Sequence, residues 1–471
     1  MRIERLELHN FRFFAAGQFA FPARFTVLIG ENGRGKSALL NGLRIAAGAW
    51  LLGFKEAERL HIEQEDIRRV ETDTRFVPQF PALVRAIGVV EGRPVTWARQ
   101  RNDFKGGLGR TGWAEAKPLI ELARQCDELT NGALQEIDLP VLVYFSTARL
   151  WVGAKKAVAL KTKGSKIQDG YAQALTPDHK RSGPASRTVA LGWIKKMYLK
   201  MLEEQASSFQ KLNYEGPATS AELGKLKQAL GNSDAGRLLD AVFQAITTCV
   251  PDWSYLSWDL ENDDLAGLYS RPDGSEERVP LYYLSDGLRT MAGMVAEIAY
   301  RCAILNGHRG GDAIRESQGL VLIDELDMHL HPNWQRHVVR DLKKAFPNLQ
   351  FVVTTHSPFI VQSLGKEEVI NLDYEDPGIP LSPKEMPIDD VAVDIMGVED
   401  KLGLEGEENQ KVADQHTDLL SAAIRVANGR IDQVTSQQLE ALEESVSDQG
   451  LRMALRMERI SKEHPAANAP Q

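Results

Sequence analysis

The segment from Gly30 to Ser37 has the residue types and spacing of a phosphate-binding loop. Its glycines allow backbone N–H groups to curve around an anion, and the N-terminus of a following helix adds the positive end of its dipole. We expect the ammonium of Lys36 to reach the β- and γ-phosphates of a nucleotide and the hydroxyl of Ser37 to bind Mg²⁺. The other loop residues expected to contact the nucleotide are Asn32, Gly33 and Gly35.

Polar side chains that suit phosphate chemistry also follow two later apolar runs. Asp324 and Glu325 come directly after residues 319–323, and His356 follows the run that begins at residue 349. A carboxylate suits Mg²⁺, so we expect Asp324 to be a metal ligand, directly or through water, and Glu325 to be the general base for an attacking water. A lone histidine is more often structural, but the place of His356 after an apolar strand predicts a hydrogen bond to the γ-phosphate or to that water.

A buried parallel sheet is needed to bring these groups together. Residues 25–29 before the loop, residues 319–323 and the run that begins at residue 349 are nearly continuous apolar segments. Such segments are typical of parallel strands that are covered on both faces. Residues 38–48 have the pattern of a helix that starts at the loop. We also expect strands before residue 22, hairpins at 82–97 and around Pro272, and a strand at 140–149. The sequence therefore predicts an α/β fold with the phosphate site at the edge of a sheet.

Composition limits the kind of protein that the chain can be. Its 471 residues, 43% hydrophobic and 26% charged, are those of a globular protein with a large core. We expect no membrane segment and no signal peptide, because no apolar run approaches the length of a membrane span. The three cysteines are far apart, so we expect buried thiols and a reducing cytoplasm.

The region 149–200 carries an excess of Lys and Arg, although the net charge of the chain is −9. Phosphate contacts need basic side chains, so this region is our candidate for a nucleic-acid surface. A solvated loop explains the same composition equally well.

Four motifs stand in the order typical of one ATPase clan. They are Gly30–Ser37, Leu284–Gly287, Leu322–Glu325 and Thr355–Ser357, together with Asn10–Arg12 near the start and Glu325–Pro332. In this order the chain resembles the ATP-binding-cassette clan, in the branch that holds RecF, SMC heads and OLD-family proteins. The resemblance implies an α/β P-loop ATPase head with a mixed sheet lobe and an antiparallel β lobe. It also implies four parts: head at 1–150, basic loop and helical insertion at 151–278, head again at 279–373, and a Pro-rich connector with a helical C-terminal region at 374–471.

The same resemblance implies that two heads face each other and enclose two ATP molecules. Ser285 and Gly287 of one subunit would contact the γ-phosphate that Lys36 of the other subunit holds. Asp327 would lie at the dimer junction. Arg12 is either a nucleotide-side residue or simply the end of a strand with aromatic core residues.

Two features near the site have more than one interpretation. Gln64 and Asp66 are candidates for a polar loop that faces the nucleotide, and a plain surface loop is an equal alternative. For His329 and His331 we favour supporting or packing roles over metal binding, because no third ligand is evident.

Within this branch the chain looks most like the PtuA-like ATPases of Septu and retron antiphage-defence systems. The resemblance implies a Mg-ATP-dependent ATPase that regulates a separate HNH-type nuclease, without a nuclease domain of its own. Asp389, Asp390 and Asp394 are interpreted as a solvated acidic connector. The alternative is a RecF- or SMC-like DNA-repair ATPase that clamps or loads on DNA.

Overall fold

The computed structural model describes residues 1–397 with short gaps. The gaps are 23, 56, 73–74, 104–110, 132–135, 148–165, 178–185, 212–232, 272, 375–378 and 380–381. Met1–Gly397 form one compact unit, and Val398–Gln471, a second unit, lie outside the described residues.

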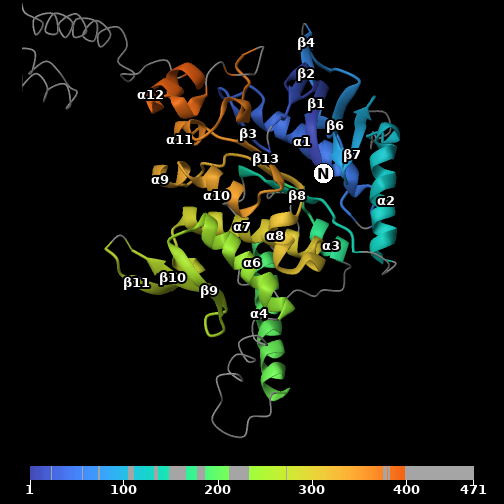
Figure 1. The fold of residues 1–471 in the computed structure, drawn as a ribbon. Coiled ribbons are helices and arrows are strands. Elements are labelled where there is room, and N and C mark those ends of the chain that lie inside the picture. Colours follow the sequence, from blue (N-terminus) through green and yellow to red (C-terminus); the bar gives the residue numbers. More distant parts are fainter. Residues whose placement is uncertain are drawn as a thin grey trace, which may run out of the picture. The chain divides into compact units, whose positions relative to one another are not determined.

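A five-stranded parallel sheet forms the centre of the fold, with the strand order β14-β3-β13-β12-β8. Its strands are β3 (Phe25–Ile29), β8 (Val141–Phe145), β12 (Gly319–Ile323), β13 (Leu349–Thr354) and β14 (Val369–Asn371). Every residue of these strands is buried, which explains their continuous apolar sequences. Figure 1 shows α1 (Lys36–Leu51) and α7 (Asp286–Leu305) on opposite sides of these strands. Because all strands run in the same direction, the polar residues at their carboxyl ends meet at one edge.

A four-stranded antiparallel sheet packs against α1, in the order β2-β1-β6-β7. Its strands are β1 (Arg2–Phe11), β2 (Phe14–Ala20), β6 (Ala82–Val90) and β7 (Arg93–Arg101), and the hairpin β4 (Arg69–Thr72) and β5 (Arg75–Pro78) lies between β2 and β6 in sequence. The two layers are close, since a Cβ at Gly42 of α1 would lie 2.9 Å from the Leu8 side chain. Gln350 of β13 joins the two sheets, because its amide bonds both backbone groups of Ile3 at 2.7 and 2.8 Å.

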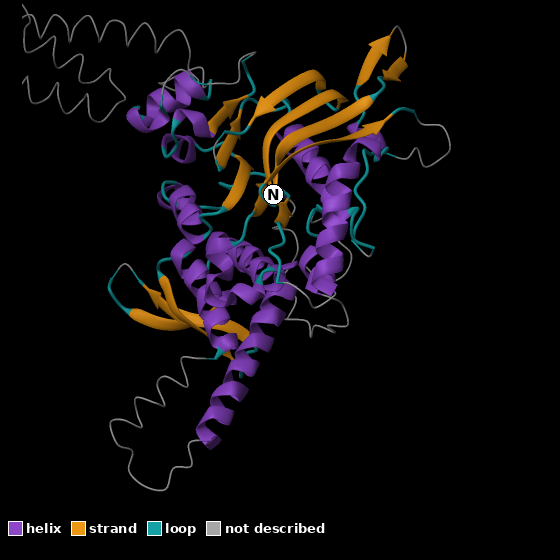
Figure 2. Ribbon diagram, turned by 45° about the vertical axis from the view of Figure 1, so that its right-hand side comes forward, coloured by secondary structure: helices purple, strands orange, loops and turns teal. Residues whose placement is uncertain are grey.

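The remaining elements are helices and a further antiparallel sheet. The helices are α2 (Lys117–Asn131), α3 (Lys166–Tyr171), α4 (Ser186–Lys211), α6 (Asp234–Cys249), α8 (Ala313–Glu316), α9 (Pro332–Gln335), α10 (Val338–Ala345), α11 (Pro358–Gln362), α12 (Ile388–Asp390) and a π-helix at Val391–Ile395. The strands β9 (Trp253–Asp259), β10 (Asp264–Ser270) and β11 (Glu276–Pro280) form an antiparallel sheet. Figure 2 shows this sheet on the far side of the helices from the other strands.

The structure confirms the predicted α/β fold and both predicted hairpins. Among the described strands, the central sheet is parallel and the antiparallel strands form separate sheets. The division into four parts stays a prediction.

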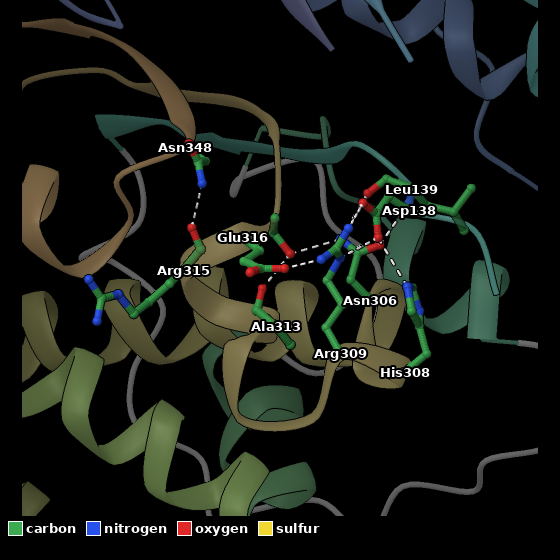
Figure 3. Close-up of polar contacts among 10 residues, drawn as sticks. Asp138, Leu139, Asn306, His308, Arg309, Ala313, Arg315, Glu316 and Asn348 are labelled. Atoms are coloured by element: carbon green, nitrogen blue, oxygen red, sulfur yellow. Dashed lines mark hydrogen bonds and ion pairs between the residues drawn. The ribbon is translucent and has the colours of Figure 1, made fainter. Parts of the chain in front are cut away.

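An ion-pair network fixes the entry to β8 (Figure 3). The Arg309 guanidinium lies between the carboxylates of Asp138 and Glu316, with its Nε 2.6 Å from Asp138 Oδ1. His308 Nε2 lies 3.0 Å from the same oxygen. The buried side chain of Asn306 accepts from Leu139 N at 2.7 Å and donates to Leu139 O at 3.0 Å. The segment after α7 is therefore bonded to the residues that lead into β8.

This network predicts a pH-dependent contribution to stability. Hydrogen bonds from Arg309 lower the pKa of Asp138 below its ordinary value. A carboxylate with a depressed pKa in the folded state stabilises the fold above its unfolded pKa of about 3.9 and loses that effect as the pH falls through the folded value. Since Asp138 is partly exposed, we expect Asp138→Asn to lower the melting temperature by about 1–3 °C at pH 7, and by less at pH 3.

Thermal melts of both proteins at the two pH values test this expectation. Asp252→Asn, which changes an exposed carboxylate in the turn before β9, is the matched control and should leave both melts unchanged. An equal deficit of the Asp138 variant at pH 7 and pH 3 would contradict an electrostatic origin.

Candidate functional site

The phosphate loop joins β3 to α1 and has the backbone conformation that its glycines permit. Gly33 and Gly35 have φ values of 88° and 98°, in the left-handed region that other residues rarely adopt. A Cβ at Gly35 would also lie 2.8 Å from the ring of Phe14. Gly35 is the N-cap of α1, so the first N–H groups of that helix point into the loop.

Lys36 is buried at the base of this loop. Its Nζ donates to Gly30 O at 2.5 Å and to Glu31 O at 3.0 Å. Burial lowers the pKa of Lys36, and the nearby carboxylates of Asp373, Asp324 and Glu325 oppose this effect. Among the described residues, the hydrogen-bond partners of the ammonium are carbonyl oxygens, which a phosphate could replace.

The expected metal-binding pair is brought together from distant segments. Ser37 Oγ lies 3.1 Å from Asp324 Oδ2, although the two residues are 287 positions apart in the chain. Asp324 follows β12, and its backbone N–H donates to Phe145 O of β8 at 2.9 Å. A hydroxyl beside a carboxylate is an oxygen donor set that suits Mg²⁺, so these two residues fit the predicted ion.

Thr354, at the end of β13, is a supporting residue that the sequence analysis missed. Its hydroxyl donates to Asp324 Oδ1 at 2.7 Å and accepts from the backbone N–H of Glu325 at 2.7 Å. The available signal was a hydroxyl residue at the carboxyl end of an apolar run, two positions before His356. Thr354 thereby fixes the orientation of both predicted functional carboxylate residues.

Glu325 and His356 follow neighbouring parallel strands, as predicted. Ile323 of β12 pairs with Val353 of β13, so both residues lie at the same edge of the sheet. Glu325 is half-buried with a left-handed backbone, φ 54°, which starts a turn away from the strand direction. His356 is exposed, and its backbone N–H donates to Asp327 Oδ1 at 3.2 Å. Asp327 also accepts from the hydroxyl of Thr355 at 2.5 Å.

The residues of the second motif lie at the start of α7. Ser285 is the exposed N-cap residue, and its side chain makes no capping hydrogen bond. Gly287 is buried, and a Cβ there would lie 2.3 Å from His329 O, so only glycine permits this approach.

His331 has a capping role, since its Nδ1 accepts from Asn333 N at 3.3 Å at the start of α9. Among the described residues there is no cluster of three or more His, Cys, Asp or Glu residues that could hold a metal ion.

Arg12 is held by Asp66, one of the two candidates for the polar loop. Arg12 Nε donates to Asp66 Oδ1 at 2.7 Å. The same buried carboxylate accepts from Asn41 Nδ2 at 2.6 Å and from Glu63 N at 2.9 Å. Asp66 therefore supports Arg12 and α1, whereas Gln64 is exposed. The structure places Arg12 in a left-handed conformation, φ 47°, at the turn between β1 and β2.

Comparison with known proteins agrees with these motifs. A family model described as "AAA domain" matches residues 5–232, and one described as "AAA domain, putative AbiEii toxin, Type IV TA system" matches residues 180–362. Together they include every residue of the site described above. The chain is an ATPase whose residues 5–362 match models of AAA domains.

Curated relatives of this ATPase come from retron and Septu systems. "Retron Vc95 probable ATPase" of Vibrio cholerae serotype O1 biovar El Tor is 25% identical over 408 residues, which are 79% of this chain and 74% of the relative. "Retron Ec83 probable ATPase" of Escherichia coli is 22% identical over 410 residues, 78% of this chain and 71% of the relative. "Septu protein PtuA" of Bacillus thuringiensis is 32% identical over 131 residues, 25% of this chain and 32% of the relative.

Among solved structures, the ATPase is similar to an Smc head bound to the C-winged helix domain of ScpA. The TM-score is 0.41 at 16% identity, over 82% of this chain and 99% of the Smc head. The expected fold class agrees with the parallel and antiparallel sheets observed here.

Other sequence predictions for the ATPase concern its surface and its thiols. The centre of the basic region 149–200 lies outside the described residues, so the nucleic-acid surface stays a prediction. This centre includes Lys155, Lys156, Lys161 and Lys163.

The three cysteines, Cys126, Cys249 and Cys302, are free and buried, as expected. Burial raises the pKa of all three thiols, to about 11 for Cys126 and about 12 for Cys302. No helix in the described part of the chain has the length and apolar character needed to span a bilayer.

Proposed function

We propose that this ATPase binds and hydrolyses Mg-ATP in composite sites between two subunits, and that its nucleotide state controls a separate nuclease in antiphage defence. The observation that supports the nucleotide site most directly is the 3.1 Å approach of Ser37 Oγ to Asp324 Oδ2 beside the loop. The retron and Septu relatives support the role in defence. The HNH class of the nuclease rests on the sequence resemblance.

Each residue of the site has a separate role in hydrolysis. Lys36 exchanges the carbonyl oxygens of Gly30 and Glu31 for phosphate oxygens. Ser37 and Asp324 hold Mg²⁺, which when bound neutralises charge on the phosphates. Glu325, oriented through its backbone by Thr354, accepts a proton from the attacking water. His356, exposed at the same edge, donates a hydrogen bond to the γ-phosphate.

The proposal of a composite site depends on the part of the motif Leu284–Gly287 that is exposed at the protein surface. Ser285 and Asp286 are exposed at the N-terminus of a 20-residue helix, and Asp286 pairs with Arg289 of the same helix. The free N–H groups and the dipole of such a helix favour an anion. A γ-phosphate held by the loop of a second subunit supplies that anion.

A bulky cation at Ser285 is expected to prevent association without affecting the bound nucleotide. In a hydrolysis-deficient Glu325→Gln background, Mg-ATP should convert the protein from monomer to dimer. Ser285→Arg in the same background should bind nucleotide with unchanged affinity and stay monomeric, because the exposed position faces the partner. Light scattering with and without Mg-ATP measures the association.

Thr96→Arg, an exposed substitution on β7, is the matched control and should dimerise as the parent does. A nucleotide-dependent dimer of the Ser285 variant would contradict the composite site. Loss of nucleotide binding by this variant would instead show that Ser285 acts within its own subunit.

A further inference from the structure

The carboxylate of Asp373 contacts the phosphate loop from an element that lies more than 340 positions away in the chain. The backbone N–H of Glu31 donates to Asp373 Oδ1 at 3.0 Å and Oδ2 at 3.1 Å, with 342 positions between the two residues. Arg34 Nε lies 3.1 Å from Asp373 Oδ1. The Asp373 side chain is only 16% exposed. One carboxylate therefore fixes two points of the loop.

Gly30 gives this carboxylate the space that it occupies. A Cβ at Gly30 would lie 3.2 Å from Asp373 Oδ1 and 3.4 Å from its Cγ. Gly30 also has φ 137°, a conformation that L-residues with a side chain rarely adopt. Gly30 therefore has two roles: it leaves room for the carboxylate of Asp373, and it permits the backbone conformation of the turn.

The backbone of Asp373 is held in place from behind. Its N–H donates to Asn371 Oδ1 at 2.9 Å, and Asn371 Nδ2 donates to Ile395 O at 2.7 Å. Asn371 is 1% exposed at the end of β14. Leu372 N donates to Ile29 O at 3.0 Å, which continues the pairing of β14 with β3. The carboxylate is therefore preorganised, since the residues around it leave its backbone little freedom.

The contacts of Asp373 leave the phosphate-binding part of the loop open. Asp373 accepts from the amide of Glu31, the second residue of the loop. Within the described part of the chain, the backbone N–H groups of Asn32, Gly33 and Gly35 have no hydrogen-bond acceptor. These are the amides expected to face an anion.

We propose that Asp373 is a positioning residue of the nucleotide site, which holds the first arm of the phosphate loop so that its later amides and Lys36 stay ready for phosphate. The inference rests on the proposed function of the loop as the ATP site. Asp373 touches neither nucleotide nor water in this role. A carboxylate placed to repel the phosphates would have the opposite effect on nucleotide affinity, so experiment separates the two.

The variants Asp373→Ala and Asp373→Asn in the full-length ATPase test the proposal. Loss of the charge-assisted bonds in Asp373→Ala should raise KM and the nucleotide Kd by about 10- to 100-fold, with kcat within about twofold of the parent. Asp373→Asn keeps an oxygen acceptor for the Glu31 amide, so its KM should recover to within about threefold of the parent. Steady-state ATPase assays and calorimetric titration with Mg-ATP measure these constants, and thermal melts monitor the fold.

Glu367→Ala, which removes an exposed carboxylate just before β14, is the matched control and should leave KM unchanged. Unchanged or tighter nucleotide binding by Asp373→Ala overturns the proposal. Equal loss of affinity in the Ala and Asn variants together with lowered melting temperatures also overturns it, because that result indicates a general structural role. Lys36→Ala is measured in parallel: if Lys36→Ala loses nucleotide and Asp373→Ala does not, the ATP site stands and the positioning role fails.

Discussion

Glu325→Gln is expected to lower kcat for ATP hydrolysis by about 10²- to 10⁴-fold, the usual contribution of a general base. The amide cannot accept the proton of the attacking water. Nucleotide affinity should change little, because the predicted phosphate and metal contacts belong to Lys36, Ser37 and Asp324. The backbone N–H of residue 325 still donates to Thr354 Oγ1, so the turn after β12 keeps its geometry.

Single-turnover hydrolysis and nucleotide titration together measure this effect. Glu128→Gln, at an exposed position of α2, is the matched control and should hydrolyse ATP as the parent does. Wild-type turnover by Glu325→Gln would refute Glu325 as the base. A parallel loss of affinity would show that its carboxylate belongs to the binding site instead.

Lys36→Ala is expected to weaken nucleotide binding by about 10²- to 10³-fold. The ammonium lies at the base of the loop, and charged hydrogen bonds to phosphate are strong. Lys36→Arg should not restore affinity, because a planar guanidinium does not fit where a point charge donates to Gly30 O and Glu31 O.

Equilibrium binding of a fluorescent ATP analogue measures the loss, and a thermal melt reports on the fold. Lys344→Ala, an exposed lysine of α10, is the control and should bind as the parent does. Retained binding by Lys36→Ala in a folded protein would remove the central residue of the proposed site.

The core of the fold was predictable because its signals are local. Residues 25–29, 319–323 and 349–354 are apolar runs of strand length, and each is followed at once by functional residue types. Parallel strands place their carboxyl ends at one edge, so the meeting of Ser37 with Asp324 follows once these runs are recognised. The roles of Lys36 and Glu325 are predictions that the variants above test, and the role of His356 in hydrolysis also remains a prediction.

Contacts between distant segments were not predictable from the sequence. Asp373 has no motif around it, and the motif next to Thr354 does not identify the partners of its hydroxyl. The contacts of these two residues depend on β14 pairing with β3 and on β13 pairing with β12. Asp66 was open to two interpretations, because a carboxylate in a polar stretch looks the same whether it is solvated or, as here, buried beneath Arg12. Burial of a polar group is decided by neighbours that the local sequence does not identify.

The contact between Gly287 and the turn that follows β12 has a consequence for cooperativity. Glu325 begins this turn, and His329, with φ 62°, presents its carbonyl oxygen to Gly287 at the other end. In the proposed dimer, the motif at Ser285 contacts the nucleotide that the partner subunit binds. Glu325 acts on the nucleotide that its own subunit binds. Because close packing transmits displacement across so short a turn, we expect the two nucleotide sites of the proposed dimer to share a coupling free energy, with an equal effect in both directions.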